Sequence, residues 1–236
     1  MNLYREIIII LERLAQEKKE VKLINSHKGI PISYDATIQG FNTSGVIFQV
    51  HKYQVVCLES ERQTYLYTDL LPSVVKAKVA NIDIITGKVT LTGFAYAVET
   101  IGKRMMLRVE PDQPISVVIS NNKRRLKGNL ADISEKGIGI YVQASQTFTS
   151  SVFIRHSKVL INLRLPTEPC EITLDGIISH IRKDGQAYHL GINIAPDPII
   201  KGAITSFISQ RQIEILCELQ MLYDQLLQEN LKQPKS

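Results

Sequence analysis

The sequence has little of what several protein classes depend on. Its 236 residues include no tryptophan, three cysteines and 6% aromatic residues. Cys57, Cys170 and Cys217 lie far apart, so they fit neither a disulfide framework nor the CxxC spacing of a zinc site, and we expect reduced core residues. The sparse aromatic content argues against a platform on which single-stranded nucleic acid stacks.

Long apolar runs are also missing. The run Ile7–Ile10 is followed closely by Glu12 and Arg13, so it is too short for the core of a signal peptide. No later stretch approaches the length of a membrane span. We therefore expect a cytoplasmic protein.

The sequence contains no recognisable catalytic motif. Its five histidines form neither an HxxxH nor an HxH pair, and the chain has no nucleophile elbow, P-loop or Rossmann glycine fingerprint. We therefore assign no catalytic residue, no metal ligand and no cofactor, and we expect a protein that is not an enzyme.

The composition is that of a globular protein with a mild positive charge. Hydrophobic residues make up 44% and charged residues 22% of the chain, which is enough to bury a real core. The length favours two domains. The net charge of +5 comes from 28 Lys and Arg against 23 Asp and Glu. This favours an anionic partner but is far from the dense basic tract of a DNA-binding arm.

Periodicity divides the chain into helical ends and two β regions. Residues 3–19 have apolar positions at helical spacing. Residues 21–100 contain short strand-like runs between turn residues, QVVCLE among them, and predict a small antiparallel β domain. Six further runs predict a second, compact barrel: PISVVI, GNLADI, GIGIYV, VLINLRL, EITLDGIISHI and AYHLGINI.

The end of the chain is helical again. Ile208, Ile215, Leu219, Leu222 and Leu226 form a seam with 7-4-3-4 spacing, which packs on the protein's own barrel or pairs with a second copy to form a homodimer. The fold class is therefore mainly β, with two small antiparallel barrels in tandem and a helix at each end. We place the domain boundaries at residues 1–102, 103–202 and 203–236.

Two short motifs carry the candidate site. Arg104 and Arg108 lie four residues apart just after the domain boundary, and Asp132, Ser134 and Gly137 follow where one strand turns into the next. Alone, the first motif is typical of a solvated basic linker and the second of an ordinary hairpin. Their order, their separation of 24 residues (132 minus 108) and the surrounding barrel make a chance combination improbable.

Together the motifs R-x-x-x-R and D-x-S-x-x-G resemble the signature of the PilZ domain, over residues 103–200. The resemblance implies a six-stranded barrel that binds cyclic di-GMP through Arg104, Arg108, Asp132, Ser134 and Gly137. The preceding β domain makes the layout similar to flagellar-brake proteins of the YcgR type. That similarity implies a change in the arrangement of the two domains on binding, and a protein partner such as the flagellar motor at the basal body.

Chemistry supports these roles. An arginine fork binds phosphate oxygens or the O6 and N7 edge of guanine, so we expect Arg104 and Arg108 to close over the ligand. Asp132 suits the N–H groups of a guanine, Ser134 can donate to a phosphate, and Gly137 lets the backbone come close. We leave His180 out of the site, because a lone histidine on a strand is more often structural.

The sequence is also compatible with two other functions. One is a scaffold that needs no ligand and assembles through the C-terminal helix. The other is a general nucleic-acid binder that uses the positive charge and whose binding depends steeply on salt. The complete set of motif residues favours the cyclic di-GMP receptor, with no DNA partner. PilZ proteins also act on polysaccharide export, secretion and transcription, so the process under control is open.

Overall fold

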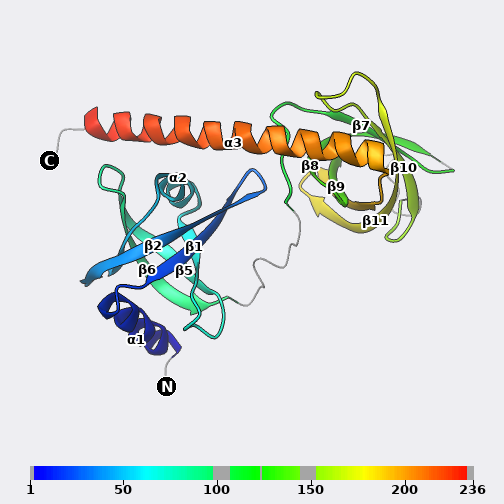
Figure 1. The fold of residues 1–236 in the computed structure, drawn as a ribbon. Coiled ribbons are helices and arrows are strands. Elements are labelled where there is room, and N and C mark those ends of the chain that lie inside the picture. Colours follow the sequence, from blue (N-terminus) through cyan, green and yellow to red (C-terminus); the bar gives the residue numbers. More distant parts are fainter. Residues whose placement is uncertain (1–2, 98–106, 123, 144–152, 233–236) are drawn as a thin grey trace. The chain divides into compact units, whose positions relative to one another are not determined.

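The chain folds into two compact units, each built on a closed barrel (Figure 1). The computed structural model describes residues 3–97, 107–122, 124–143 and 153–232. The first unit comprises Met1–His27, Pro31–Met105 and Ile215–Ser236, and the second comprises Lys28–Ile30 and Met106–Glu214. The boundary predicted between residues 102 and 103 lies outside the described residues and stays a prediction.

The first unit holds two helices and an antiparallel barrel. The helices are α1 (Leu3–Gln16) and α2 (Lys52–Glu61), and the strands are β1 (Glu20–His27), β2 (Ile30–Asn42), β3 (Gly45–Gln49), β4 (Gln63–Tyr67), β5 (Val75–Asp83) and β6 (Lys88–Tyr96). The strands close in the order β1-β2-β3-β6-β5-β4. The strands form because buried residues alternate with more exposed ones along the chain. In β1, for example, every second residue from Val21 to Asn25 is buried.

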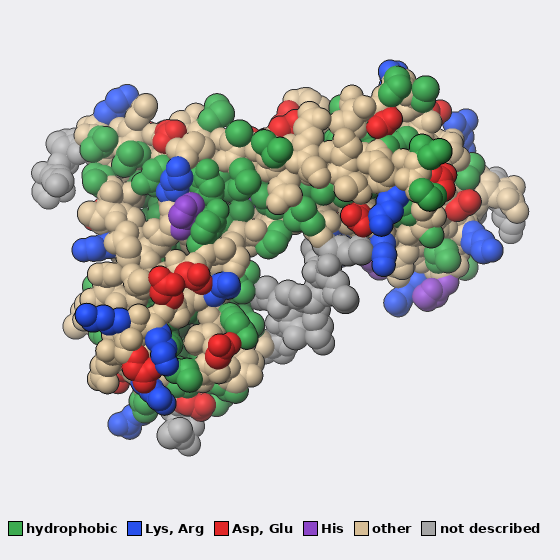
Figure 2. Space-filling model, viewed as in Figure 1, with side chains coloured by type: hydrophobic (Ala, Val, Ile, Leu, Met, Phe, Trp, Pro, Cys, Tyr) green, Lys and Arg blue, Asp and Glu red, His purple; other side chains and the backbone are tan. Residues whose placement is uncertain are grey.

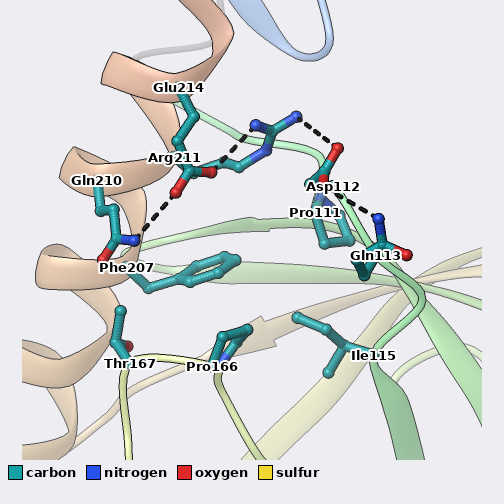
Figure 3. A pocket seen from close by; sticks show the side chains of 10 residues that line it. All are labelled: Pro111, Asp112, Gln113, Ile115, Pro166, Thr167, Phe207, Gln210, Arg211 and Glu214. Carbon is teal, nitrogen blue, oxygen red and sulfur yellow. Dashed lines mark hydrogen bonds and ion pairs between the residues drawn. The ribbon is translucent and has the colours of Figure 1, made fainter.

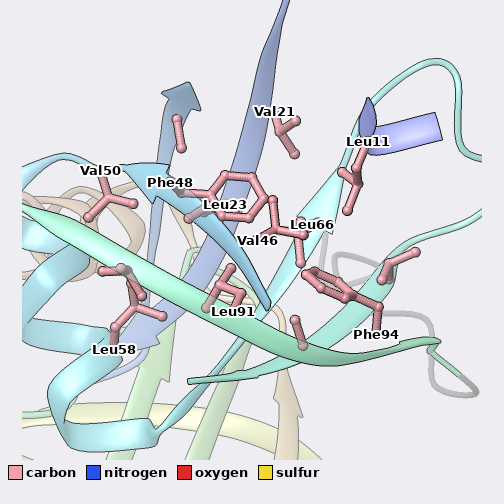
Figure 4. Packing of buried hydrophobic residues seen from close by; sticks show 14 of the residues in the cluster. Leu11, Val21, Leu23, Val46, Phe48, Val50, Leu58, Leu66, Leu91 and Phe94 are labelled. Atoms are coloured by element: carbon pink, nitrogen blue, oxygen red, sulfur yellow. The ribbon is translucent and has the colours of Figure 1, made fainter. Parts of the chain in front are cut away.

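The core of this unit lies inside the barrel and beneath α1. Leu23, Phe48, Leu66 and Leu91 are fully buried and point toward one another (Figure 4). The predicted opening helix is confirmed, and it packs through Ile7, Leu11 and Leu14. Burying each such side chain contributes about 1.5–3 kcal/mol to folding.

One predicted strand of the first unit is wrong. The run QVVCLE lies in α2, where five consecutive residues from Gln54 to Leu58 are buried. A short stretch buried on all sides has no period that separates strand from helix. The helix begins after His51, whose side chain accepts the N–H of Tyr53, and ends at Arg62, which has a left-handed backbone (φ 54°).

A buried polar cluster attaches α2 to the barrel. The side chain of Gln54 is fully buried and donates to Asn25 Oδ1, which also accepts the hydroxyl of Thr64 at 2.7 Å. Asn25 in turn donates to Gln63 O at 2.8 Å. Because buried amides need such partners, these bonds hold the helix against β1 and β4.

The second unit is also a closed antiparallel barrel, as predicted. Its strands are β7 (Ser116–Ser120), β8 (Arg125–Ser134), β9 (Gly137–Gln143), β10 (Lys158–Leu163), β11 (Ile172–Asp184) and β12 (Ala187–Ile194). They close in the order β10-β11-β12-β9-β8-β7, and each overlaps one of the six runs expected from the sequence. The inward positions are aliphatic, for example Val117, Ile119, Ile140 and Ile161.

The C-terminal helix α3 (Pro198–Lys232) contributes to both units. Asp197 caps its first turn, because its carboxylate accepts the N–H groups of Ile199 and Ile200 at 2.9 Å. In the predicted seam Ile208, Ile215 and Leu219 are buried. Leu222 is 37% exposed and Leu226 is partly buried.

The cysteines only partly match the expectation of core residues. Cys57 is buried in α2, whereas Cys170 and Cys217 are exposed. All three are free thiols, as expected. The prediction is wrong for Cys170, which lies in a bend before β11, and for Cys217, which lies on the exposed face of α3, because composition does not reveal these positions.

Candidate functional site

The two sequence motifs are brought together by a short backbone bridge. Val109 and Ile133 exchange two N–H···O bonds of 3.0 Å, and both side chains are fully buried. This bridge places the neighbouring Arg108 beside Asp132. Arg108 Nη1 donates to Asp132 Oδ1 at 2.9 Å, and the two side chains remain 28% and 21% exposed. A guanidinium and a carboxylate 24 residues apart thus form one partly open site.

A β-bulge directs Asp132 to this site. The register of β8 against β9 shifts between Leu130 and Asp132, so that Asp132 lies opposite Gly139. An extra residue in one strand re-aims the side chains that follow it. Ile133 therefore points into the core while Asp132 stays on the outer face of the barrel.

Ser134 and Gly137 form the turn that follows. Ser134 is 2% exposed, and its hydroxyl donates to Gly137 O at 3.1 Å. Its single donor is thus used within the hairpin, and its oxygen still has acceptor capacity. A Cβ on Gly137 would lie 3.4 Å from both Arg108 Nη2 and Ser134 Oγ. Gly137 therefore leaves room beside the arginine.

Three aromatic rings that the sequence did not assign to the site lie near Asp132. The ring centroid of His189 lies 5.0 Å from that of Tyr141 and 5.5 Å from that of His180. A Cβ on Gly139 would lie 2.8 Å from Asp132 Oδ2 and 3.0 Å from His189 Nε2. Asp132 and His189 therefore converge over one glycine.

The pairing of β9 with β12 explains this convergence. Gly139 lies opposite Gly191, and Tyr141 lies opposite His189. The ring of His180 lies against the backbone of Gly191, where a Cβ would come within 2.0 Å of it. In the sequence, the run AYHLGINI places His189 two residues before Gly191. Only the strand register shows that His189 lies opposite Tyr141.

Burial and the neighbouring charged groups shift the titration of His189. Burial lowers the pKa of His189 below 6.5, the charge of Asp132 opposes this, and His180, Arg182 and Arg108 add to the lowering. On the face of each unit that Figure 2 shows, Lys and Arg side chains are interspersed with Asp and Glu. That face therefore carries no continuous basic stripe of the kind that binds nucleic acid.

The remaining candidates are placed as follows. Arg104 lies in residues 98–106, outside the described part of the chain, so its role stays a prediction. The basic hairpin between β7 and β8 exposes Arg124, Arg125 and Lys127 to solvent. These side chains lie on the solvent-exposed hairpin and not beside the Arg108–Asp132 pair.

A cavity lies in the same unit but not at the Arg108–Asp132 pair. It has a volume of about 190 Å³ and is bordered by the segment Pro111–Ile115, by Pro166 and Thr167, and by Phe207 and Arg211 of α3 (Figure 3). None of the motif residues lines this cavity, which borders the segment that follows Arg108.

The described residues contain neither a candidate metal site nor a candidate membrane-spanning helix. In the described part of the chain, no three His, Cys, Asp or Glu side chains are grouped so that they could hold a metal ion. Over the same residues, no helix has the length and hydropathy needed to span a membrane.

Comparison with known proteins gives a family and a set of similar folds. Residues 103–210 match the model of the PilZ domain. A search of curated protein sequences gave no match. Among solved structures, YcgR from Escherichia coli in complex with c-di-GMP is 11% identical, with 92% of this chain and 93% of that chain covered and a TM-score of 0.43.

Two further solved structures are similar. The inhibitor of motility MotI/DgrA from Bacillus subtilis is 11% identical over 84% of this chain and 97% of that chain, with a TM-score of 0.40. The MrkH–c-di-GMP complex from K. pneumonia is 13% identical over 92% of this chain and 96% of that chain, with a TM-score of 0.41.

Proposed function

We propose that this chain is a receptor for cyclic di-GMP, because residues 103–210 match the model of the PilZ domain. The ligand is held by Arg104, Arg108, Asp132, Ser134 and Gly137. The observation that carries this proposal is the 2.9 Å pair of Arg108 and Asp132 on an open barrel face. It brings a phosphate-binding group and a guanine-binding group within one ligand's reach.

The chemistry of the site fits a guanine nucleotide. Arg108 offers a planar fork for phosphate oxygens or for guanine O6 and N7. Asp132 accepts from guanine N–H groups, to which a carboxylate is better suited than to a phosphate. The rings of His189, Tyr141 and His180 provide flat surfaces near the carboxylate, against which a base can stack.

Gly137 and Ser134 define the edge of the site. The missing side chain at Gly137 leaves space next to Arg108 Nη2. Ser134 is buried and fixes the turn through its bond to Gly137 O. In this division of roles Ser134 acts mainly through the shape of the turn, not as a phosphate donor.

We propose further that binding changes the arrangement of the two units and passes the signal to a protein partner in motility control. Support comes from the layout of two barrels in tandem and from the similarity of that layout to flagellar-brake proteins. A ligand shifts such an equilibrium only by its difference in affinity for the two arrangements. Partner binding must therefore depend on cyclic di-GMP.

Calorimetry with cyclic di-GMP tests the receptor proposal. We expect binding with a free energy of about −8 kcal/mol or better, which corresponds to micromolar affinity. Arg104→Ala, Arg108→Ala and Asp132→Ala should each weaken it by about 10- to 100-fold, because one hydrogen bond to a charged group contributes about 1.5–3 kcal/mol.

The matched control is Asp175→Ala, which removes an exposed carboxylate from the outer face of β11 and should leave the affinity unchanged. GTP and linear pGpG should compete poorly. If the folded, unaltered protein does not bind cyclic di-GMP, the receptor proposal is wrong.

Assembly through α3 is a second candidate function, favoured by one observation. Ile213 and Met221 are 64% and 63% exposed, and the exposed Cys217 lies between them at four-residue spacing. An apolar stripe on a helix pairs readily with a second copy. Sedimentation should then show a concentration-dependent dimer that Ile213→Ser with Met221→Ser disrupts and the exposed-site control Gln225→Ser does not.

A further inference from the structure

The first half of α3 contacts Glu135, which lies within the second motif, and the segment that follows Arg108 of the first motif. On one side, Glu135 lies within the turn between Ser134 and Gly137. Its carboxylate accepts the hydroxyl of Thr205 at 3.5 Å and lies 3.5 Å from Lys201 Nζ. Both partners belong to the first two turns of α3. The turn that borders the ligand site is therefore attached to this helix.

On the other side, Arg211 holds the segment that follows Arg108. Its Nε donates to Glu110 O at 2.9 Å, and its Nη2 lies 4.0 Å from Asp112 Oδ1 (Figure 3). Nη1 donates to Glu214 Oε2 at 3.1 Å within the helix. Glu110 is two residues from Arg108, and its own N–H bonds to Lys28 O at 3.1 Å in the same unit.

The burial of Arg211 makes this contact specific. Its side chain is 2% exposed, and desolvation of a guanidinium opposes folding unless carboxylates and carbonyls surround it. An apolar side chain of similar volume would fill the same space without that desolvation. The guanidinium group of Arg211 is planar and its donors have fixed directions. A small shift of Glu110 or Asp112 therefore changes the contacts that Arg211 makes with them.

The neighbouring cavity allows such a shift. The space of about 190 Å³ separates Pro111 and Ile115 from Phe207 of α3 (Figure 3). Close-packed interiors resist small displacements, but side chains that border a gap can rearrange without a clash. The segment after Arg108 can therefore take a second position relative to α3.

From these contacts we infer that Arg211 is a positioning residue for the ligand site, and that α3 senses ligand through Arg211 on one side and Glu135 on the other. The inference rests on the proposed function. When Arg108 closes on a ligand, Glu110 and Asp112 move with it, and the bonds to Arg211 transmit the movement to α3. Coupling is reciprocal, so whatever α3 binds changes the affinity for ligand by the same factor.

The test combines calorimetry with amide hydrogen exchange on the full chain, using cyclic di-GMP as the probe. We expect Arg211→Met to bind about tenfold more weakly than the unaltered protein, a change typical of coupled sites. Arg211→Lys, which keeps one donor, should be intermediate. Gln210→Met is the matched control, because Gln210 borders the same cavity and its side chain bonds to Glu214.

Hydrogen exchange separates positioning from general stability. In the unaltered protein, cyclic di-GMP should slow exchange of the amides of residues 202–214, and Arg211→Met should lose this effect at saturating ligand while Gln210→Met keeps it. If the unaltered protein binds but α3 gains no protection, or if Arg211→Met matches it in affinity and protection, the inference is wrong. If Arg211→Met does not fold, the test is whether cyclic di-GMP slows amide exchange of residues 202–214 in the unaltered protein. Absence of any binding overturns the proposed function itself.

Discussion

The two barrels have the same topology, yet only the second carries the motif residues that we propose bind the ligand. If the strands of each barrel are numbered from one to six in chain order, both rings read 1-2-3-6-5-4. The likeness extends to one hairpin. The β2–β3 register shifts between Ile38 and Gly40, and the β8–β9 register shifts between Leu130 and Asp132.

Matching the two hairpins residue by residue shows where they differ. Each bulge is followed by three paired residues and a two-residue turn, so Gly40 stands where Asp132 does and Asn42 where Ser134 does. Asn42 Oδ1 accepts the N–H groups of Ser44 and Gly45 at 2.9 Å. The first hairpin is closed by its own side chain and presents no carboxylate at the position after the bulge.

The comparison shows that the barrel fold sets the position and direction of the residue after the bulge, while the side chain at that position determines whether a ligand can be recognised. The bulge re-aims a residue in both barrels, and the residue it re-aims is glycine in one and aspartate in the other. This agrees with the general rule that function resides in sites and not in folds. Stability and ligand binding should therefore be separable by mutation.

The largest expected effect tests this separation in the first barrel. Phe48→Ala removes a fully buried ring and should lower the free energy of unfolding by about 3–5 kcal/mol. Urea unfolding measures this, and cyclic di-GMP affinity should stay unchanged while the second unit remains folded. Phe41→Ala is the control, because that ring is 41% exposed and its loss should change stability by about 0.5 kcal/mol or less. Equal losses for both variants would contradict the described core.

A smaller effect compares glycines of the two hairpins. Gly139→Ala places a Cβ 2.8 Å from Asp132 Oδ2, so the carboxylate must move, and we expect a loss of about 1 kcal/mol in binding, or about fivefold in affinity. Gly40→Ala meets no atom within 4 Å and should leave affinity unchanged and stability within about 1 kcal/mol. Calorimetry compares the two, and an unaffected Gly139→Ala would place the ligand away from Asp132.

The smallest effect concerns one histidine in each unit. Burial lowers the pKa of both His51 and His189 below 6.5, with Lys52 adding to the effect at His51. Each therefore binds fewer protons in the folded than in the unfolded state at mildly acidic pH. Each contributes stability that is present above the unfolded pKa of 6.5 and is lost as the pH falls from that value through the lower folded pKa. Asp132→Asn removes a charge that raises the pKa of His189, so that pKa should fall further while that of His51 stays unchanged.

A pH titration followed by NMR measures the pKa values of His51 and His189 in one sample. The pKa of His51 acts as an internal control, because the two histidines belong to different units. A pKa of His189 that rises in Asp132→Asn would contradict the position of the carboxylate.

Much of the fold follows from the sequence because alternation and turn residues act locally. All six runs of the second barrel overlap observed strands, and residues 3–16 are helical. The run QVVCLE could not be assigned correctly, because its side chains are buried on all sides and only Gln54, through its bond to Asn25, shows why a helix is held there.

The candidate site was predictable to the extent that it is contiguous in the chain. Arg108, Asp132, Ser134 and Gly137 stand in short motifs. By contrast, His189 and Gly139 meet only through the register of β9 and β12, and the contact of Arg211 with Glu110 spans 101 residues. Such pairs depend on tertiary geometry that no local spacing encodes.

The three free thiols also differ in chemical reactivity. Burial raises the pKa of Cys57 to about 12, with Glu61 adding to the effect, so this thiol stays protonated and inert toward alkylating dyes at neutral pH. Cys170 is exposed in the second unit and Cys217 in the first. The natural chain therefore carries one labelling position per unit, and a donor and acceptor dye on these two sulfurs form a molecular ruler that needs no engineered cysteine.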